Sequence, residues 1–316
     1  MQPEENRSKP GYLGLLEGGE LRERAEIARD MLKRCSVCPR ECGVNRLQGE
    51  TGFCRTGSKA MVASFHPHHG EEAPLSGYRG SGTIFFSNCN LSCQYCQNYD
   101  ISQLGLGREC SPSEIADMML KLQSLGCHNI NLVTPSHVVP QIIESIYIAA
   151  SKGLSIPIVY NTSSYDSLSS LSILEGIVDI YLADLKYTDN SVAERYSRAP
   201  GYADIAKDAI REMHRQVGVL KTDGKGIAIR GLMIRHLVLP NGLAGTEGAM
   251  RFIAEEISRD TFVNLMSQYR PCYRAMEIPE LGRMITPGEF REAIDMLKRC
   301  GIGRGEIQPF PGMAFL

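Results

Sequence analysis

From about residue 80 onward, short runs of β-branched and aromatic residues alternate with longer helical segments. The predicted strands are 83–87, 130–134, 157–161, 179–184, 232–239 and 262–268. The predicted helices are 112–125, 140–152, 167–176, 202–220, 246–259 and 287–299. Strands that alternate with helices of this length favour an α/β fold whose parallel sheet is made of βαβ units. Six units are too few for a closed eight-unit barrel, so they indicate a partial barrel or a doubly wound sheet.

Two of these helices begin with the same pattern, Ser111-Pro112-Ser113-Glu114 and Thr286-Pro287-Gly288-Glu289. A hydroxyl can cap each helix, proline suits the first turn, and the glutamate occupies the third position. In an open or closed parallel α/β fold, functional residues lie at the C-terminal ends of the strands. The residues that follow each predicted strand are therefore the candidates for a site.

The chain before residue 80 has a different character. Residues 21–34 predict an amphipathic helix, and residues 35–57 are rich in cysteine, glycine and arginine. We expect loops organised by a metal. The predicted division is an N-terminal metal-binding extension at 1–79 and a core at 80–316.

The chain has 11 cysteines, an odd number that does not suit a disulfide framework. Seven lie in two tight groups between residues 35 and 96, and clustered thiols without an export signal indicate metal ligands. Because free cysteine is often buried, we expect the others to be structural. These four are Cys110, Cys127, Cys272 and Cys300.

Cys89, Cys93 and Cys96 have the spacing C-x3-C-x2-C and follow directly after the strand predicted at 83–87. Three thiolates on one loop can ligate three irons of a cubane cluster and leave the fourth iron open to another ligand. A zinc knuckle is the alternative, but structural zinc sites are usually closed by four ligands. No fourth cysteine or histidine sits at near spacing.

With Tyr95 just before its last cysteine, this motif is similar to the signature of the radical S-adenosylmethionine (SAM) superfamily. The resemblance implies a partial (β/α)6 TIM-like barrel and a [4Fe–4S] cluster whose open iron is chelated by SAM. It also implies reductive cleavage of SAM to a 5′-deoxyadenosyl radical that takes hydrogen from a substrate. An electron donor such as flavodoxin or ferredoxin would then be a partner.

A closer resemblance covers most of the chain. The stretches 69–77, 80–91 and 96–98 resemble the pyruvate formate-lyase activating enzyme-like branch and its related iron–sulfur proteins, as do 267–272 and Ile285-Thr286. Asn88 stands where relatives commonly have glycine. The resemblance leaves two kinds of substrate open. One is a partner enzyme that receives a glycyl radical, and the other is a small molecule, peptide or different protein.

Three polar residues follow the second strand, where many family members have a Gly-Gly-Glu stretch that meets the methionine amino group. Thr134 and Ser136 could accept hydrogen bonds from that ammonium, and His137 could bind cofactor or substrate. Alternatively, Ser136 caps the next helix. Upstream, Glu71 and Glu72 could serve a substrate or be solvated.

Later strand ends supply five further candidates. Asn161 begins a stretch that resembles one near the cofactor in activating enzymes, and Asp184 with Lys186 resembles their Asp-x-Lys element. Residues two apart on a strand face the same way, so this pair suits a ligand with both charges, or else forms a surface ion pair. Arg235 and His236 resemble a further cofactor element, and alternation allows only one to face inward.

The N-terminal group is Cys35, Cys38, Cys42 and Cys54. Four cysteines within 20 residues can close a zinc site or ligate a second iron–sulfur cluster. Simple pyruvate formate-lyase activators lack this module. A metal-stabilised module that binds RNA or protein is a remote alternative, since arginines lie nearby but Phe53 is the only aromatic.

Charge and hydropathy exclude some function classes. With 34 basic and 36 acidic residues the net charge is −2, which gives no reason to expect a nucleic-acid partner. No apolar run approaches the roughly 18 residues of a membrane span, and the polar N-terminus lacks the apolar core of a secretory signal. We therefore expect a cytoplasmic protein that needs no membrane.

Overall fold

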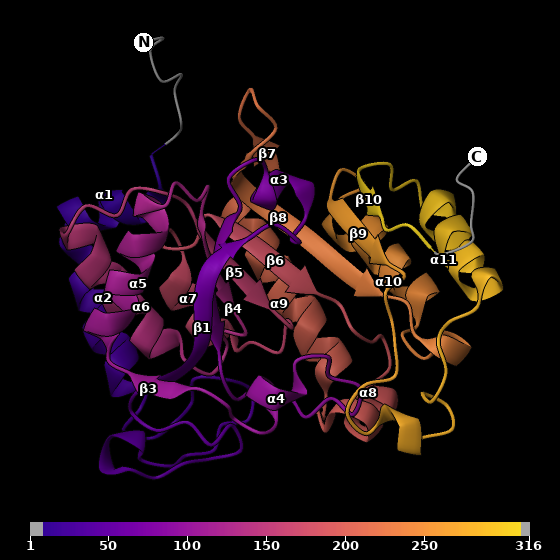
Figure 1. Cartoon of the computed structure of the whole chain (residues 1–316), viewed down its shortest axis with the longest axis horizontal. Helices are drawn as coiled ribbons and strands as arrows, with labels where there is room; N and C mark the ends of the chain where they lie inside the picture. Colours follow the sequence, from indigo (N-terminus) through magenta and orange to yellow (C-terminus); the bar gives the residue numbers. More distant parts are fainter. Residues whose placement is uncertain (1–8, 311–316) are drawn as a thin grey trace.

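The computed structural model describes residues 9–310, and in it the expected parallel strands lie side by side in one sheet (Figure 1). These strands are β2 (Ser81–Phe86), β4 (Ile130–Val133), β5 (Ile158–Thr162), β6 (Ile180–Asp184), β8 (Ala228–Leu237) and β9 (Phe262–Met266). They pair in parallel in the order β9-β8-β6-β5-β4-β2. The sheet is open and mostly parallel, as the predicted partial barrel requires.

Four further strands were not predicted: β1 (Ala60–His68), β3 (Arg108–Cys110), β7 (Lys221–Thr222) and β10 (Gly305–Ile307). β1 runs antiparallel between β2 and β3, and β10 extends the other edge beside β9. The predicted domain boundary at residue 79 therefore falls inside one sheet. β1 is hard to recognise because it contains a proline and its residues 64–66 are exposed, which breaks the apolar alternation.

The longer helices are α1 (Gly11–Glu17), α2 (Glu20–Asp30), α5 (Pro112–Ser124), α6 (Val139–Ser151), α7 (Leu168–Leu174), α8 (Asn190–Ser197), α9 (Tyr202–Val217), α10 (Thr246–Phe252) and α11 (Pro287–Arg299). Two single turns are α3 (Ala73–Ser76) and α4 (Tyr99–Ser102). Both predicted capping boxes form, at Ser111 and at Thr286. α10 ends earlier than expected because the chain continues as a π turn at Ile253–Ile257. None of the helices within residues 9–310 combines the length and hydrophobicity that a membrane crossing needs.

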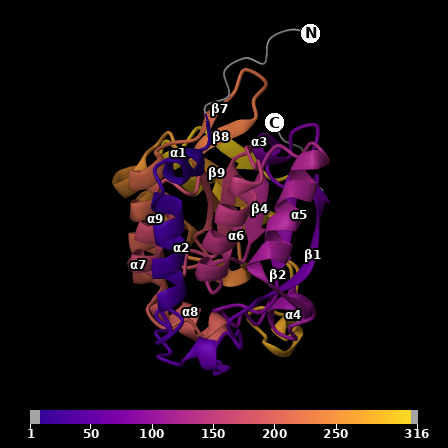
Figure 2. The same ribbon diagram turned by 90° about the vertical axis from the view of Figure 1, so that its left-hand side faces the viewer.

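The two faces of the sheet differ. Outward residues such as Ile84 and Leu132 are fully buried in the main core, which α2, α5 and α6 cover (Figure 2). On the inner face, α3 brings Leu75 into a smaller cluster with Val159 and Leu182. The segment around α3 therefore plugs one end of the partial barrel and leaves the other end, where the parallel strands finish, for a site.

Candidate functional site

The first cysteine group lies on the loop that follows β2. Asn88 has φ 67°, the left-handed conformation that glycine commonly supplies and that asparagine tolerates. Hydrogen bonds reach all three sulfurs. Leu91 N–H lies 3.3 Å from the Cys89 sulfur, the Ser197 hydroxyl 3.0 Å from that of Cys93, and the Ser102 hydroxyl 3.1 Å from that of Cys96. Donors of this kind stabilise thiolates and tune the potential of a cluster.

The three cysteines line a cavity of about 160 Å³ together with side chains from neighbouring strand ends. Those side chains are Thr134 after β4, Asn161 in β5, Asp184 and Lys186 at the end of β6, and Arg235 in β8. Thr134 has φ 62°, a strained conformation for a β-branched residue, and its N–H donates to the Asn161 carbonyl at 3.0 Å. Backbone strain of this sort concentrates at functional sites.

Asp184 joins the two cations of the cavity. Its carboxylate accepts from Lys186 Nζ at 2.6 Å and from Arg235 Nε at 2.6 Å, while Arg235 Nη2 donates to Asn161 Oδ1 at 2.6 Å. Burial opposes ionisation of Asp184, but the two neighbouring cations outweigh it and hold the pKa of this carboxyl below its usual range. The cavity thus keeps fixed charges of both signs, which suits a ligand that carries an ammonium and a carboxylate.

Glu71, which lies just before α3, reaches the same network, and its Oε2 lies 3.6 Å from Arg235 Nη1. Its side chain is only 9% exposed. Burial raises the pKa of Glu71 to about 7, although Arg235 acts in the opposite direction. Near neutral pH this carboxyl therefore exists in both protonation states.

Comparison with known proteins agrees with this geometry. Residues 83–224 match the family model of the radical SAM superfamily. The chain is 33% identical over 286 residues to the uncharacterised protein MJ0674 of Methanocaldococcus jannaschii. The matched region covers 88% of this chain and 78% of that protein. This protein belongs to the radical SAM superfamily. Membership implies a [4Fe–4S] cluster and SAM.

Other similarities are more distant. The uncharacterised protein MJ0808 of the same organism is 22% identical over 292 residues, 86% of this chain and 78% of that protein. Among solved structures, the [FeFe]-hydrogenase maturase HydG gives a TM-score of 0.49 at 13% identity over 93% of this chain and 58% of HydG. Methylornithine synthase (PylB) gives 0.47 at 13% identity, over 96% of this chain and 76% of PylB.

The two histidines predicted for the radical SAM site lie outside the cavity lining. His236 faces the helices, with its ring nitrogens 2.7 Å from the Leu185 carbonyl and 3.0 Å from the Thr246 hydroxyl. His137 bonds to the Ser87 carbonyl at 3.0 Å. Burial lowers the pKa of each to about 4, so both are neutral core residues. Of the neighbours Arg235 and His236, only Arg235 lines the cavity, because successive side chains of a strand face opposite sides.

Two other predicted residues are also engaged elsewhere. The Ser136 hydroxyl lies 3.0 Å from that of Thr162, in a buried network below the loop. The ring of Tyr95 packs edge-on against Tyr187 and Tyr269. Tyr95 therefore fixes the cysteine loop to the core instead of facing the cavity, because its large apolar ring is better buried.

Sequence reasoning missed several polar residues that line the cavity: Asn98, Ser102, Gln103 and Ser163. Ser163 directly follows the end of β5, so its position was the available signal. Asn98, Ser102 and Gln103 follow shortly after Cys96, the last cysteine of the loop. Next to Ser163, Ser164 has a φ of 61°, in the left-handed region that glycine commonly supplies.

The second cysteine group lies in irregular loops below α2. Cys35, Cys38 and Cys54 are buried, and Cys42 is half-buried against Gly52, whose Cβ, if present, would lie 2.6 Å from the Cys42 sulfur. Burial raises the pKa of Cys38 to about 12, and Cys54 and Cys35 are close enough to add to the rise. Within residues 9–310, no three such side chains already converge as on a single ion.

A buried arginine accompanies this group. Arg46 is 1% exposed, donates to the carbonyls of Gly57 and His137 at 2.9 Å, and lies 3.9 Å from the Cys35 sulfur. Its Nη2 has no hydrogen-bond partner, and no carboxylate in the described part of the chain pairs with it. Buried charges are normally compensated, so this cation needs an anion nearby.

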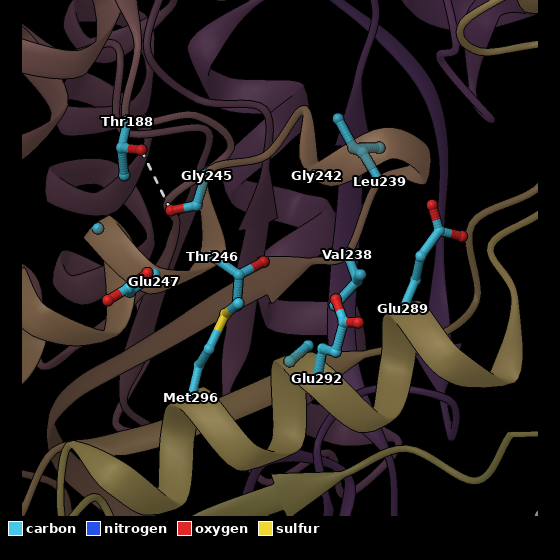
Figure 3. Close-up of a pocket in the computed structure, with 12 residues that line it drawn as sticks. Thr188, Val238, Leu239, Gly242, Gly245, Thr246, Glu247, Glu289, Glu292 and Met296 are labelled. Carbon is cyan, nitrogen blue, oxygen red and sulfur yellow. Dashed lines mark hydrogen bonds between the residues drawn. The ribbon is translucent and has the colours of Figure 1, made fainter.

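A larger cavity of about 220 Å³ lies between α10 and α11 (Figure 3). Thr188, Glu289 and Met296 are among its lining residues, and none of the lining residues is a cysteine. Its Glu289 already binds Arg283 and caps α11. The chemistry of the lining, rather than the volume, therefore identifies the cysteine cavity as the site.

Proposed function

We propose that this radical SAM enzyme abstracts hydrogen from a small-molecule, peptide or protein substrate. When bound, the cluster and SAM supply the radical chemistry: one electron cleaves a carbon–sulfur bond, and the 5′ carbon takes hydrogen from the substrate. The observation that supports this most strongly is the joint cavity of Cys89, Cys93 and Cys96 with oppositely charged strand-end side chains.

The donor set fits these groups. Three thiolates on one loop suit three irons, and hydrogen bonds from Leu91 and Ser197 reach their sulfurs. Arg235 and Lys186 would hold the SAM carboxylate, and Asp184 would keep both cations in position. Thr134 lies where its hydroxyl would accept from the SAM ammonium.

The test is anaerobic reconstitution followed by reduction with dithionite and SAM, with 5′-deoxyadenosine measured by mass spectrometry. Wild type should form deoxyadenosine, and Cys93→Ala should form none and lose iron. Cys300→Ala, which changes a half-buried cysteine of the scattered set, is the matched control and should behave as wild type. A full cluster content in Cys93→Ala would overturn the assignment.

We also propose that Cys35, Cys38, Cys42 and Cys54 hold a second metal centre, either zinc or another iron–sulfur cluster. Arg46 supports this, because four thiolates around a metal would supply the anion that this buried cation needs. Metal and sulfide analysis distinguishes the two metals. Iron near four with one zinc per chain indicates zinc, and iron near eight with extra sulfide indicates a second cluster. Cys38→Ala should remove only that metal.

The glycyl-radical activase remains the second candidate function, and the resemblance of residues 80–91 to activating enzymes favours it. Its test is electron paramagnetic resonance of a candidate partner enzyme after incubation with the reduced protein and SAM. A glycyl radical that requires Cys93 would support the activase. Either function needs an electron donor such as flavodoxin or ferredoxin. We propose that it docks beside Cys96, where Tyr99 and Leu104 are exposed.

A further inference from the structure

Buried polar groups lie one layer deeper in the partial barrel than the cysteine cavity. Asn131 precedes Val133 by two residues on β4, and Val133 lines the cavity, so both face the same side. Asn264 on β9 is the ladder partner of Arg235, which also lines the cavity. These two amides therefore extend the inner face below the SAM-binding charges.

The segment just before α3 supplies two carboxylates to this group of buried side chains. Glu72 Oε1 accepts from Asn264 Nδ2 at 2.8 Å, and Glu71 lies near enough to the Asn131 amide for it to lower the pKa of that carboxyl. Glu71 and Glu72 both act on Arg235 electrostatically. The four side chains thus form one group between β4, β9 and α3.

Several atoms of this group lack partners. Glu72 Oε2, Asn264 Oδ1 and Asn131 Oδ1 are buried and make no hydrogen bond. The exposed fractions of Glu72, Asn131 and Asn264 are 4%, 0% and 3%. Leaving a buried polar atom unpaired costs about 1–3 kcal/mol, so three such side chains together indicate a ligand.

The unpaired atoms define the chemistry of that ligand. All three are acceptors (Glu72 Oε2, Asn264 Oδ1 and Asn131 Oδ1), and an ammonium has three donors. Charge acts in the same direction, because Asp184 is paired with Arg235 and Lys186, whereas Glu72 makes no ion pair within residues 9–310. A cation bound beside Glu72 would supply the partner that this buried carboxylate lacks.

We propose that Glu72, Asn131 and Asn264 form the substrate subsite and that the substrate presents a primary ammonium to it. This inference rests on the proposed hydrogen abstraction and names its substrate class, an amine. The ammonium would anchor the substrate below SAM and bring a neighbouring C–H bond to the 5′ carbon.

Perdeuterated n-butylamine and n-butanol are matched probes. With reduced enzyme and SAM, a C–D bond of the bound probe would break and the 5′ carbon would gain deuterium. The remaining carbon radical would take an electron from excess dithionite and a proton from water. We expect deuterated deoxyadenosine from butylamine at least tenfold above that from butanol. Equal transfer from both probes would show that water satisfies the buried atoms, and would overturn the proposal.

Two variants test the residues. Glu72→Gln keeps the hydrogen bond from Asn264 but removes the charge, and it should lose at least tenfold of the deuterium transfer. Asn131→Val should lose a similar share of the deuterium transfer. Its thermal midpoint should not fall, whereas it would fall if Asn131 served only to stabilise the fold. The exposed Glu17→Gln is the control.

These outcomes distinguish a failure of the proposed subsite from a failure of the proposed function. Deoxyadenosine without preferential transfer from the amine would overturn only the subsite. Absence of deoxyadenosine in wild type would overturn the proposed function itself. As a cluster-independent measurement, butylamine hydrochloride should raise the thermal midpoint of the isolated wild-type protein and not that of Glu72→Gln, with sodium chloride at equal ionic strength as reference.

Discussion

The two cysteine groups differ in what surrounds them. Cys89, Cys93 and Cys96 follow a regular strand and open onto a cavity with fixed charges of both signs. The group from Cys35 to Cys54 lies in irregular loops, and its nearest charge is the buried Arg46. The surroundings of the first group suit a metal that must bind a further ligand, whereas those of the second group suit a metal whose coordination is complete.

The largest effect expected on the open group comes from Asp184→Asn. The amide cannot neutralise Arg235 and Lys186, and breaking a buried charge pair costs about 3–5 kcal/mol. We therefore expect deoxyadenosine formation to fall about 100- to 4000-fold, with iron and sulfide content unchanged. Asp189→Asn, at the exposed start of α8, is the control. Loss of iron from Asp184→Asn would mean that the charges support the cluster loop rather than SAM.

Arg46→Met tests the closed group. If thiolates around a metal balance Arg46, the metal-loaded variant should lose about 3 kcal/mol of unfolding free energy. The chelator-stripped proteins should differ by less, because only the hydrogen bonds to Gly57 and His137 are then lost. Arg40→Met, a neighbouring arginine over the ring of Phe53, is the control. Equal losses with and without metal would remove the argument for an anionic centre.

A pH titration follows from Glu71. Its pKa is raised to about 7 by burial, whereas the unfolded chain ionises near 4.3. Between these values only the unfolded state releases the proton, so this group lowers stability as pH rises from about 4.5 to 7. Relative to wild type, Glu71→Gln should gain about 3 kcal/mol from pH 4.5 to pH 8, measured by urea unfolding. A gain independent of pH would contradict the assignment.

Much of the sheet could be predicted because its strands are buried on both faces and read as short apolar runs. The six parallel strands and both capping boxes follow from such local patterns. β1 could not be predicted, since its pairing with β2 joins segments whose own sequence alternates poorly. The division placed at residue 79 falls between β1 and β2, which pair in one sheet.

In the site too, local sequence position predicted some residues, and tertiary packing decided the others. Residues directly at strand ends, such as Asn161, Asp184 and Arg235, line the cavity as expected. His137 and His236 do not, because only tertiary packing decides which polar side chains are buried in the outer core. Asn131 and Asn264 gave a signal that was not used: each is an amide within an otherwise apolar strand.

The smallest effect tests how the protein tunes the open group. The Ser197 hydroxyl, on α8, lies 3.0 Å from the Cys93 sulfur and also 2.8 Å from the Tyr187 hydroxyl. A hydrogen bond to a ligand sulfur stabilises the reduced, more negative cluster. Ser197→Ala should therefore lower the midpoint potential by tens of millivolts, on the order of 1 kcal/mol, measured by redox titration with electron paramagnetic resonance.

Ser191→Ala, on the exposed side of the same helix, should leave the potential unchanged. Deoxyadenosine formation with excess dithionite should fall by only a few-fold in Ser197→Ala, since the cavity charges remain. The absorption of any second cluster should not move, because Ser197 contacts only the first group. A shift in both centres would mean that the two cysteine groups are coupled, and Asn90, 3.9 Å from the Cys89 sulfur and close to Cys38, would be the connection.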